Sequence, residues 1–196
     1  MGLMMRLLKI FKISFLGLMA IAVMNAHADQ GDLIKLMKSG GHILMIRHAY
    51  APGSGDPANF KIGDCATQRN LNNRGRNQAR AIGEWLRSKG IKDAKVYSSQ
   101  WCRCQETATL LGLGPVAELP ALNSFYGMPQ NREPNIKTLR SFIANLPADG
   151  ELIIFVTHFV TILEIAGEGV SPGEGVVLKL KVGGAYDVLG WLTFGF

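Results

Sequence analysis

Three segments along the chain predict β-strands, and the first of them is a continuous apolar run. They cover residues 43–46, 96–98 and 152–156, and the first is bounded by Gly40-Gly41 and by polar residues. A strand with one face in water alternates apolar and polar residues, whereas a strand covered on both faces is apolar throughout. The continuous run therefore indicates a sheet that is buried on both sides.

Apolar residues between these segments recur with helical spacing. Residues 75–88 carry one apolar face, formed by Ala79, Ile82, Trp85 and Leu86. Helices are also predicted over residues 101–111 and 135–145. Because strands alternate with helices, we predict the α/β class: a three-layer α/β/α sandwich with a mostly parallel sheet.

Residues at the predicted helix ends agree with these boundaries. Ser98 or Ser99 can cap the helix over residues 101–111, and Pro134 stands where a first helical turn tolerates proline. Gly90 and Gly112 follow helices at positions that favour a left-handed residue.

The pattern changes after Gly167 to segments rich in glycine and valine. Residues 176–182 and 186–191 alternate in the manner of strands, and Gly183-Gly184 lies between them. Two adjacent glycines between alternating segments predict a hairpin turn. The C-terminal part should therefore add an antiparallel pair.

The first 28 residues have the three regions of a signal peptide: a basic segment, an apolar centre and small residues before a cleavage site. These are Arg6, Lys9 and Lys12, residues 13–24, and Ala26 with Ala28. The apolar centre is shorter than the roughly 20 residues of a membrane-spanning helix, which argues against an uncleaved anchor. We expect a mature domain over residues 29–196, periplasmic or secreted, without stable membrane insertion.

Composition suits one folded domain, with 47% hydrophobic and 18% charged residues. The 21 basic and 15 acidic residues give a formal charge of +6. Cleavage removes three basic residues and no acid, so 18 against 15 leaves +3. Without a run of Lys and Arg interleaved with aromatic residues, nucleic acid is a poor candidate partner.

Three cysteines bear on the loop over residues 51–73, which is rich in Pro, Gly, Asp and Asn. Such a long loop is usually functional or covalently tied down. In an oxidising compartment one disulfide and one free thiol are expected. Cys65 should pair with Cys102 or Cys104, and Cys102 is favoured because a helix would turn Cys104 toward the interior. Zinc is disfavoured, because a single residue separates Cys102 from Cys104 and no His stands at a matching distance.

Reactive side chains follow each of the three predicted strands. Arg47-His48 follows the first, Ser98-Ser99 with Arg103 the second, and Thr157-His158 the third. In open α/β sheets the ligand crevice lies outside the carboxyl ends of the strands. Arginine matches phosphate oxygens with a fork of donors, and a neutral imidazole attacks through one nitrogen if the other donates to a backbone carbonyl. These residues therefore predict a phosphoryl site with His48 as nucleophile.

Three motifs resemble those of the histidine phosphatase superfamily, which has the phosphoglycerate mutase-like fold. Residues 44–49 resemble its Arg-His-Gly/Ala motif, residues 97–108 its second-arginine motif, and residues 156–158 its second-histidine motif. The resemblance implies a phosphohistidine formed on His48 and then hydrolysed. Arg47, Arg103 and a protonated His158 would stabilise the transition state, with no cofactor or metal.

Ser124 departs from the family pattern. Related proteins carry Leu-Asn-Glu where residues 122–124 read Leu-Asn-Ser, and the Glu donates a proton to the leaving oxygen. The other branch has Asp directly after the second His, where this chain has Phe159. Either another carboxyl donates the proton, or the leaving group needs none, or the protein binds phosphate esters without turnover. The candidate carboxyls are Glu133 first, then Asp56 and Asp64.

The leading hypothesis is an exported phosphatase that hydrolyses a phosphorylated small molecule, as a phosphomonoester or a phosphoramidate. In layout the chain is similar to small exported bacterial members that act on lipopolysaccharide heptose phosphates, and to minimal phosphohistidine phosphatases. That similarity implies an envelope phosphosugar. A phosphate-ester binding or sensing module is the alternative, and a mutase-like isomerase is the weakest, because its substrates are intracellular and Ser124 replaces its Glu.

Overall fold

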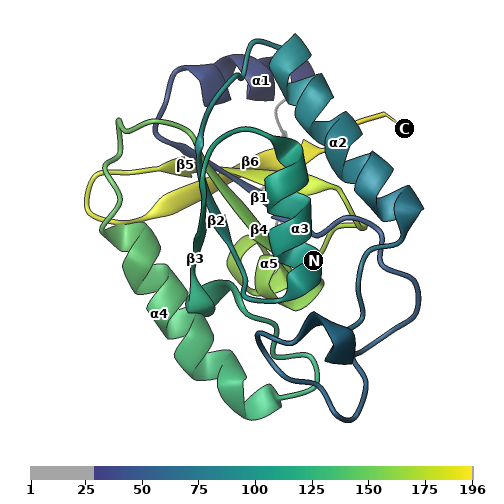
Figure 1. Cartoon of the computed structure of the whole chain (residues 1–196). Coiled ribbons are helices and arrows are strands. Elements are labelled where there is room, and N and C mark those ends of the chain that lie inside the picture. The colour runs from purple at the N-terminus through teal and green to yellow at the C-terminus, as the bar shows by residue number, and fades with distance from the viewer. Residues whose placement is uncertain (1–28, 196) are drawn as a thin grey trace, which may run out of the picture.

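A six-stranded mixed sheet forms the middle layer of the protein, in a computed structural model that describes residues 29–195 (Figure 1). Its strand order is β3-β2-β4-β1-β5-β6. The strands are β1 (His42–Arg47), β2 (Lys95–Ser98), β3 (Val116–Glu118), β4 (Ile153–Thr157), β5 (Gly175–Leu180) and β6 (Tyr186–Leu192). The helices are α1 (Gln30–Lys38), α2 (Asn73–Ser88), α3 (Cys102–Leu111), α4 (Arg132–Ala144) and α5 (Phe159–Ala166).

Strand pairing confirms the predicted sandwich. β1, β4, β2 and β3 run parallel, β5 pairs antiparallel with β1, and β6 pairs antiparallel with β5. The predicted hairpin is present between β5 and β6, with Gly183 and Gly184 both at positive φ. The antiparallel pair accounts for the change of pattern after Gly167.

Both faces of the sheet are buried, as the continuous apolar run indicates. Leu44 and Ile46 of β1 pack in one core with α1, α2 and α3, whereas Ile43 and Met45 pack in the other with α4 and α5. All four side chains are fully buried. Successive residues of a strand point to opposite faces, so the same short run supplies both cores.

Some local predictions differ from the structure. The N-cap of α3 is Trp101, so neither Ser98 nor Ser99 caps it, although the Trp101 backbone N–H donates to Ser99 Oγ at 3.3 Å. Helix α4 begins at Arg132 rather than at residue 135, which keeps Pro134 in its first turn. The prediction of left-handed Gly90 and Gly112 is confirmed.

Strand register aligns the ends that carry the reactive residues. Arg47 of β1 lies opposite Thr157 of β4, and Ser98 of β2 lies opposite Val156. The ladder continues one step further: the His48 backbone N–H donates to Thr157 O at 2.9 Å, and that of Ser99 donates to Val156 O at 3.0 Å. The side chains that follow the three strands therefore meet at one edge.

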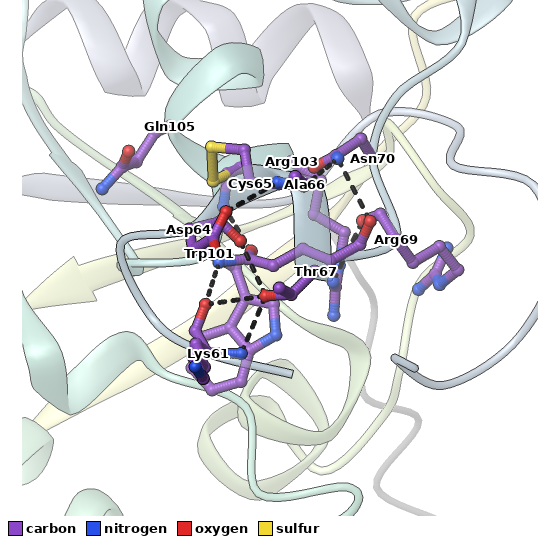
Figure 2. Close-up of a disulfide and its surroundings, with 12 residues drawn as sticks. Lys61, Asp64, Cys65, Ala66, Thr67, Arg69, Asn70, Trp101, Arg103 and Gln105 are labelled. Carbon is purple, nitrogen blue, oxygen red and sulfur yellow. Dashed lines mark hydrogen bonds between the residues drawn. A yellow bond between two sulfur atoms is a disulfide. The ribbon is translucent and has the colours of Figure 1, made fainter. Parts of the chain in front are cut away.

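The predicted disulfide joins Cys65 and Cys102, and Cys104 is a buried free cysteine (Figure 2). Cys65 lies in the loop between β1 and α2, in the short 3-10 helix Cys65–Thr67. A hydrogen bond of 3.0 Å from the Cys102 backbone N–H to Gln68 Oε1 reinforces the covalent link. The loop is thus fastened to the first turn of α3.

Candidate active site

His48 is held in the form that a nucleophile requires. Its Nδ1 lies 2.8 Å from the carbonyl oxygen of Ala49, which can only accept, so Nδ1 carries the proton and Nε2 keeps its lone pair. The side chain is 2% exposed. Burial, with the neighbouring positive charge of Arg103, lowers the pKa of His48 to about 3. The imidazole is therefore neutral at physiological pH.

Three arginines surround His48 in the cavity. Arg47 and Arg103 are the two that the sequence predicts, and Arg69 of the long loop is a third. Arg69 is fixed by bonds from Nε to Gly55 O at 2.8 Å and from Nη1 to Ala51 O at 2.6 Å. Burial and the charge of Arg103 lower the pKa of both Arg47 and Arg69.

Two guanidinium donors in this cluster have no partner within the described part of the chain. They are Nε of Arg47 and Nε of Arg103, and Arg103 is only 3% exposed. A buried donor without an acceptor costs free energy, which a bound anion would recover. The cluster is therefore built for an anion with several oxygens.

His158 is neutral in the free site, whereas the protonated form that the resemblance implies belongs to the transition state. Its Nδ1 lies 3.5 Å from Nη2 of Arg103, which can only donate, and its Nε2 lies 2.8 Å from Ser99 Oγ. Burial and the charge of Arg103 lower its pKa well below the usual value. The Nε2 proton points to Ser99, whose hydroxyl donates to Asn123 Oδ1 at 3.2 Å.

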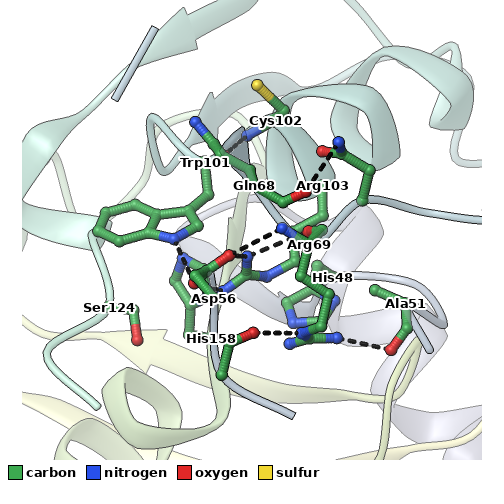
Figure 3. A network of polar contacts seen from close by, with 12 residues as sticks. His48, Ala51, Asp56, Gln68, Arg69, Trp101, Cys102, Arg103, Ser124 and His158 are labelled. Carbon is green, nitrogen blue, oxygen red and sulfur yellow. Dashed lines mark hydrogen bonds and ion pairs between the residues drawn. The ribbon is translucent and has the colours of Figure 1, made fainter. Parts of the chain in front are cut away.

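Asp56 is the candidate carboxyl that the structure places in the cavity (Figure 3). Its oxygens accept from Nη1 and Nη2 of Arg103 at 2.7 and 3.2 Å, from Trp101 Nε1 at 3.0 Å and from the Arg69 backbone N–H at 3.0 Å. Desolvation opposes its ionisation, but the hydrogen bonds and charge of Arg103 outweigh it, and the pKa of Asp56 is lowered. Asp56 is thus a carboxylate in the free site.

Two other candidate carboxyls lie elsewhere. Glu133 is exposed in the first turn of α4 and does not line the cavity. Asp64 accepts from the Ala66 backbone N–H at 3.2 Å and caps the short helix that carries Cys65. The structure therefore does not bring Glu133, the first-ranked proton donor, to the phosphoryl site.

The cavity has a volume of about 450 Å³, and both charged and apolar side chains line it. Ser124, which stands in the family's acid position, lines it, and its Oγ accepts from the Tyr126 backbone N–H at 3.3 Å. The apolar wall is formed by Phe60, Trp101, Tyr126, Met128, Phe159 and Val160.

Sequence reasoning missed Arg69 and Trp101. Arg69 lies in the loop that Cys65 and Cys102 fasten, and Trp101 is the N-cap of α3, within the segment 97–108 that resembles the second-arginine motif. The predicted tether was the one feature of the sequence that pointed to this loop. It did not say which loop side chains face inward.

Within residues 29–195 no group of three or more His, Cys, Asp or Glu side chains is arranged to hold a metal ion. In the same part of the chain no helix is long and apolar enough to cross a membrane. The predicted signal peptide, residues 1–28, lies outside the described residues.

Comparison with known proteins supports the chemistry of this site. The sequence model of the family described as Histidine phosphatase superfamily (branch 1) matches residues 43–133, which include Arg47, His48 and Arg103. The mitochondrial serine/threonine-protein phosphatase Pgam5 of Drosophila virilis is 40% identical over 81 residues, 41% of this chain and 25% of that protein. Pgam5 of Drosophila willistoni is 38% identical over 74 residues, 38% of this chain and 23% of that protein. The chain spans about a quarter of the length of these curated relatives.

Solved structures share the fold. A protein histidine phosphatase SixA complexed with tungstate aligns with a TM-score of 0.54 at 15% identity, over 78% of this chain and 97% of that one. A putative phosphohistidine phosphatase SixA from Nakamurella multipartitia aligns with a TM-score of 0.54 at 19% identity, over 78% and 95%. At these identities the likeness shows the fold alone.

The family model matches less than half of the chain, and the solved structures show the phosphoglycerate mutase-like fold. The family match and the names of the similar proteins support a phosphatase. His158 lies beyond the matched segment, and it is the pairing of β1 with β4 that brings it to His48, with ring centroids 5.5 Å apart.

Proposed function

We propose that the protein is a phosphatase that hydrolyses a phosphorylated small molecule through a phosphohistidine on His48. One observation carries this proposal: Nδ1 of a buried, neutral His48 donates to Ala49 O, so Nε2 is free to attack. Nucleophilic catalysis needs such an activated group beside donors that hold the transferred phosphoryl group.

The reaction has two balanced steps. Nε2 of His48 forms a bond to phosphorus as the P–O bond to the leaving group breaks, with its electron pair going to the leaving oxygen. Nδ1 keeps its proton against Ala49 O, so the phosphorylated ring is cationic and gives up the phosphoryl group readily. Water then attacks phosphorus, the P–N pair returns to Nε2, and the water proton goes to solvent and ultimately to the leaving group.

The arginine cluster supports binding of the phosphoryl group. Arg47, Arg69 and Arg103 bring three positive charges to the cavity, against the single carboxylate of Asp56 among the residues that line it. A phosphate dianion therefore meets an excess of positive charge. Preorganised donors of this kind stabilise charge on the equatorial oxygens of the transition state.

The residues that line the cavity do not include a good proton donor for the leaving group. Asp56 is held as a carboxylate, and the Ser124 hydroxyl is too weak an acid to replace the family's Glu. The site therefore suits substrates whose leaving group departs without a strong acid, such as aryl phosphates and phosphoramidates. The printed name of SixA, a protein histidine phosphatase, accords with a phosphoramidate, whereas that of Pgam5, a serine/threonine-protein phosphatase, names proteins that carry alkyl phosphate esters.

Export belongs to the proposal on sequence grounds alone, and so does an envelope phosphosugar, as the alternative substrate to an aryl phosphate. The signal-peptide pattern of residues 1–28 supports a periplasmic or secreted protein. Three cysteines, of which Cys65 and Cys102 form a disulfide, accord with an oxidising compartment.

Turnover of an aryl phosphate by the purified protein tests the proposal. We expect release of phosphate that His48→Ala abolishes, and a phosphorylated protein, stable to alkali and labile to acid, when the reaction is quenched. Arg69→Ala should lower kcat/KM about 10²-fold. Arg80→Ala, at an exposed position on α2, is the matched control and should leave it unchanged. Phosphate release that survives His48→Ala would overturn the proposal.

A phosphate-binding or sensing module is the second candidate, because Asp56 already occupies both terminal nitrogens of Arg103. Such a module would bind a phosphate ester tightly and leave it intact. Calorimetric binding of phenyl phosphate without release of phosphate, on esters and on phosphoramidates, would decide for the module.

A further inference from the structure

Four aromatic side chains border the cavity beside the arginine cluster. We call Phe60, Trp101, Tyr126 and Phe159 the aromatic rim. Two of them are large side chains that stay accessible to solvent, with Tyr126 69% and Phe159 41% exposed. Exposed aromatic surface next to a charged cavity marks a ligand-binding groove more often than a packing requirement.

Two rim residues form a rigid flat wall. The rings of Phe60 and Trp101 stack with centroids 4.9 Å apart and an interplanar angle of 19°. The indole is fixed in turn, because Trp101 Nε1 donates to Asp56 at 3.0 Å (Figure 3). The wall therefore has a set orientation beside the phosphoryl site before any ligand arrives.

Phe159 is also fixed in place although it is exposed. The Arg47 guanidinium lies 5.4 Å from its ring centroid. A Cβ at Gly169 would lie 2.0 Å from Phe159 Cε2, so the ring also packs against a residue that has no side chain. Neither Phe159 nor Tyr126 belongs to a hydrophobic core cluster of the described residues. Their positions thus serve the cavity rather than the interior.

We propose that the aromatic rim binds the leaving group, and that the substrates are phosphate esters of aromatic hydroxyl groups. This inference rests on the proposed function and names its substrate class. An aromatic leaving group would contact Phe60, Tyr126 and Phe159 while its phosphate reaches the arginines. Trp101 is only 2% exposed and supports the Phe60 ring. Offset or edge-on contacts between aromatic rings hold a flat group better than a flexible polyol.

The acidity of the leaving group also favours aromatic substrates, independently of their shape. A phenol has a pKa of about 10, whereas an alkyl alcohol is closer to water, at about 15.7. When the P–O bond breaks, the electron pair leaves on the phenolate oxygen, which takes its proton from solvent afterwards. A site whose only lining carboxyl is the ion-paired Asp56 therefore favours phenols over sugar alcohols.

Three phosphate esters distinguish the effect of an aromatic ring in the leaving group from the effect of the leaving group's acidity. Phenyl phosphate has an aromatic and acidic leaving group. A fluorinated alkyl phosphate whose alcohol has a matched pKa has an acidic leaving group without a ring, and glucose 6-phosphate has neither property. We expect kcat/KM for phenyl phosphate to exceed that for the fluorinated ester about tenfold, and glucose 6-phosphate to be the poorest. Free phosphotyrosine and a phosphotyrosyl peptide, run in parallel, show whether the ring comes from a small molecule or from a protein.

Rim variants test the contact directly. Tyr126→Ala should lower kcat/KM for phenyl phosphate about fivefold and leave that for the fluorinated ester within twofold, and Tyr126→Phe should restore the value. Val182→Ala, at a side chain 94% exposed in the β5–β6 turn, is the matched control. Equal kcat/KM for the two esters, or an equal loss on both in Tyr126→Ala, would overturn the inference and leave the phosphatase proposal intact.

A binding measurement keeps the inference testable if no ester is turned over, a result that counts against the proposed function alone. Phenylphosphonate and methylphosphonate carry the same charged head without a scissile P–O bond. We expect calorimetry to show phenylphosphonate binding about tenfold more tightly, with the difference lost in Tyr126→Ala. Equal affinity of the two would contradict a rim that binds aromatic groups.

Discussion

Asp56 and Arg103, which both line the cavity, form a two-point ion pair with N–O distances of 2.7 and 3.2 Å. The side chains are 17% and 4% exposed, so water screens the pair little. The carboxylate thus occupies the fork of donors that a phosphoryl group would otherwise use. Asp56 stabilises the empty site and competes with the anion that fills it.

Replacing Asp56 should therefore affect stability and phosphate affinity in opposite directions. Asp56→Asn leaves Arg103 without a counter-charge, and we expect the free energy of unfolding to fall by about 3 kcal/mol. Inorganic phosphate should bind about tenfold more tightly, because a nearby negative charge is gone. Thermal unfolding with and without phosphate measures both effects, and saturating phosphate should recover most of the lost stability.

Asp187→Asn is the control for that experiment, because the Lys181–Asp187 pair is about half exposed and should contribute little. An Asp56→Asn protein as stable as the wild type, with unchanged phosphate affinity, would contradict this account of the pair.

Stability should fall in acid because of His48. Its pKa is about 3 in the folded protein and about 6.5 in the unfolded chain. Above pH 6.5 both states leave the ring neutral; between pH 6.5 and 3 only the unfolded chain takes up the proton, so the free energy of unfolding falls as the pH falls. The loss should approach roughly 4 kcal/mol by pH 3.

Denaturant titrations at several pH values between 3 and 7 measure this slope. His48→Asn should flatten it, and the lowered pKa of His158 should account for a further part. The same slope in His48→Asn as in the wild type would show that His48 does not cause it. For the same reason, kcat/KM should show no transition near pH 6.5 that originates in His48.

The Cys65–Cys102 disulfide should contribute about 2–4 kcal/mol to stability, because it closes a loop between residues 37 apart in sequence. Cys65→Ala/Cys102→Ala should lower the free energy of unfolding by that amount. A reducing agent should destabilise the wild type similarly and leave the double variant unchanged. Equal sensitivity of both proteins to the reductant would point to an effect other than this bond.

Restoring a carboxyl at Ser124 should broaden the substrates. Ser124→Glu places an acid in the cavity, and we expect kcat for an alkyl phosphate to rise at least tenfold, with little change for an aryl phosphate. Ser124→Gln has nearly the same shape without the proton, so it should give no gain. A gain in both variants would indicate a steric effect instead of proton donation.

The sequence predicts the centre of this fold better than its edges. The run over residues 43–46 identifies β1 because its burial on both faces removes polar residues altogether. Helix α5 was not predicted, because eight mostly apolar residues lack the polar face that makes a helical period visible. Strand β3, with three residues at the sheet edge, is too short to show a pattern.

The site residues also differ in how well the sequence predicts them. Arg47 ends β1, and His48 and His158 directly follow β1 and β4, so the topology of a parallel sheet brings them together. Arg69 and Asp56 come from a loop whose path depends on contacts with α3, above all with Arg103 and Trp101. Glu133 was ranked above Asp56 because nothing in the sequence says which loop carboxyl faces the cavity.

The link between Cys65 and Cys102 also bears on how a ligand is bound. Arg69 lies four residues after one end of the bond and Arg103 directly after the other. Their relative placement is therefore settled when the protein folds and is not established anew at each encounter with a phosphate. The entropic cost of ordering a long loop falls on folding, so more of the contact energy is retained as affinity.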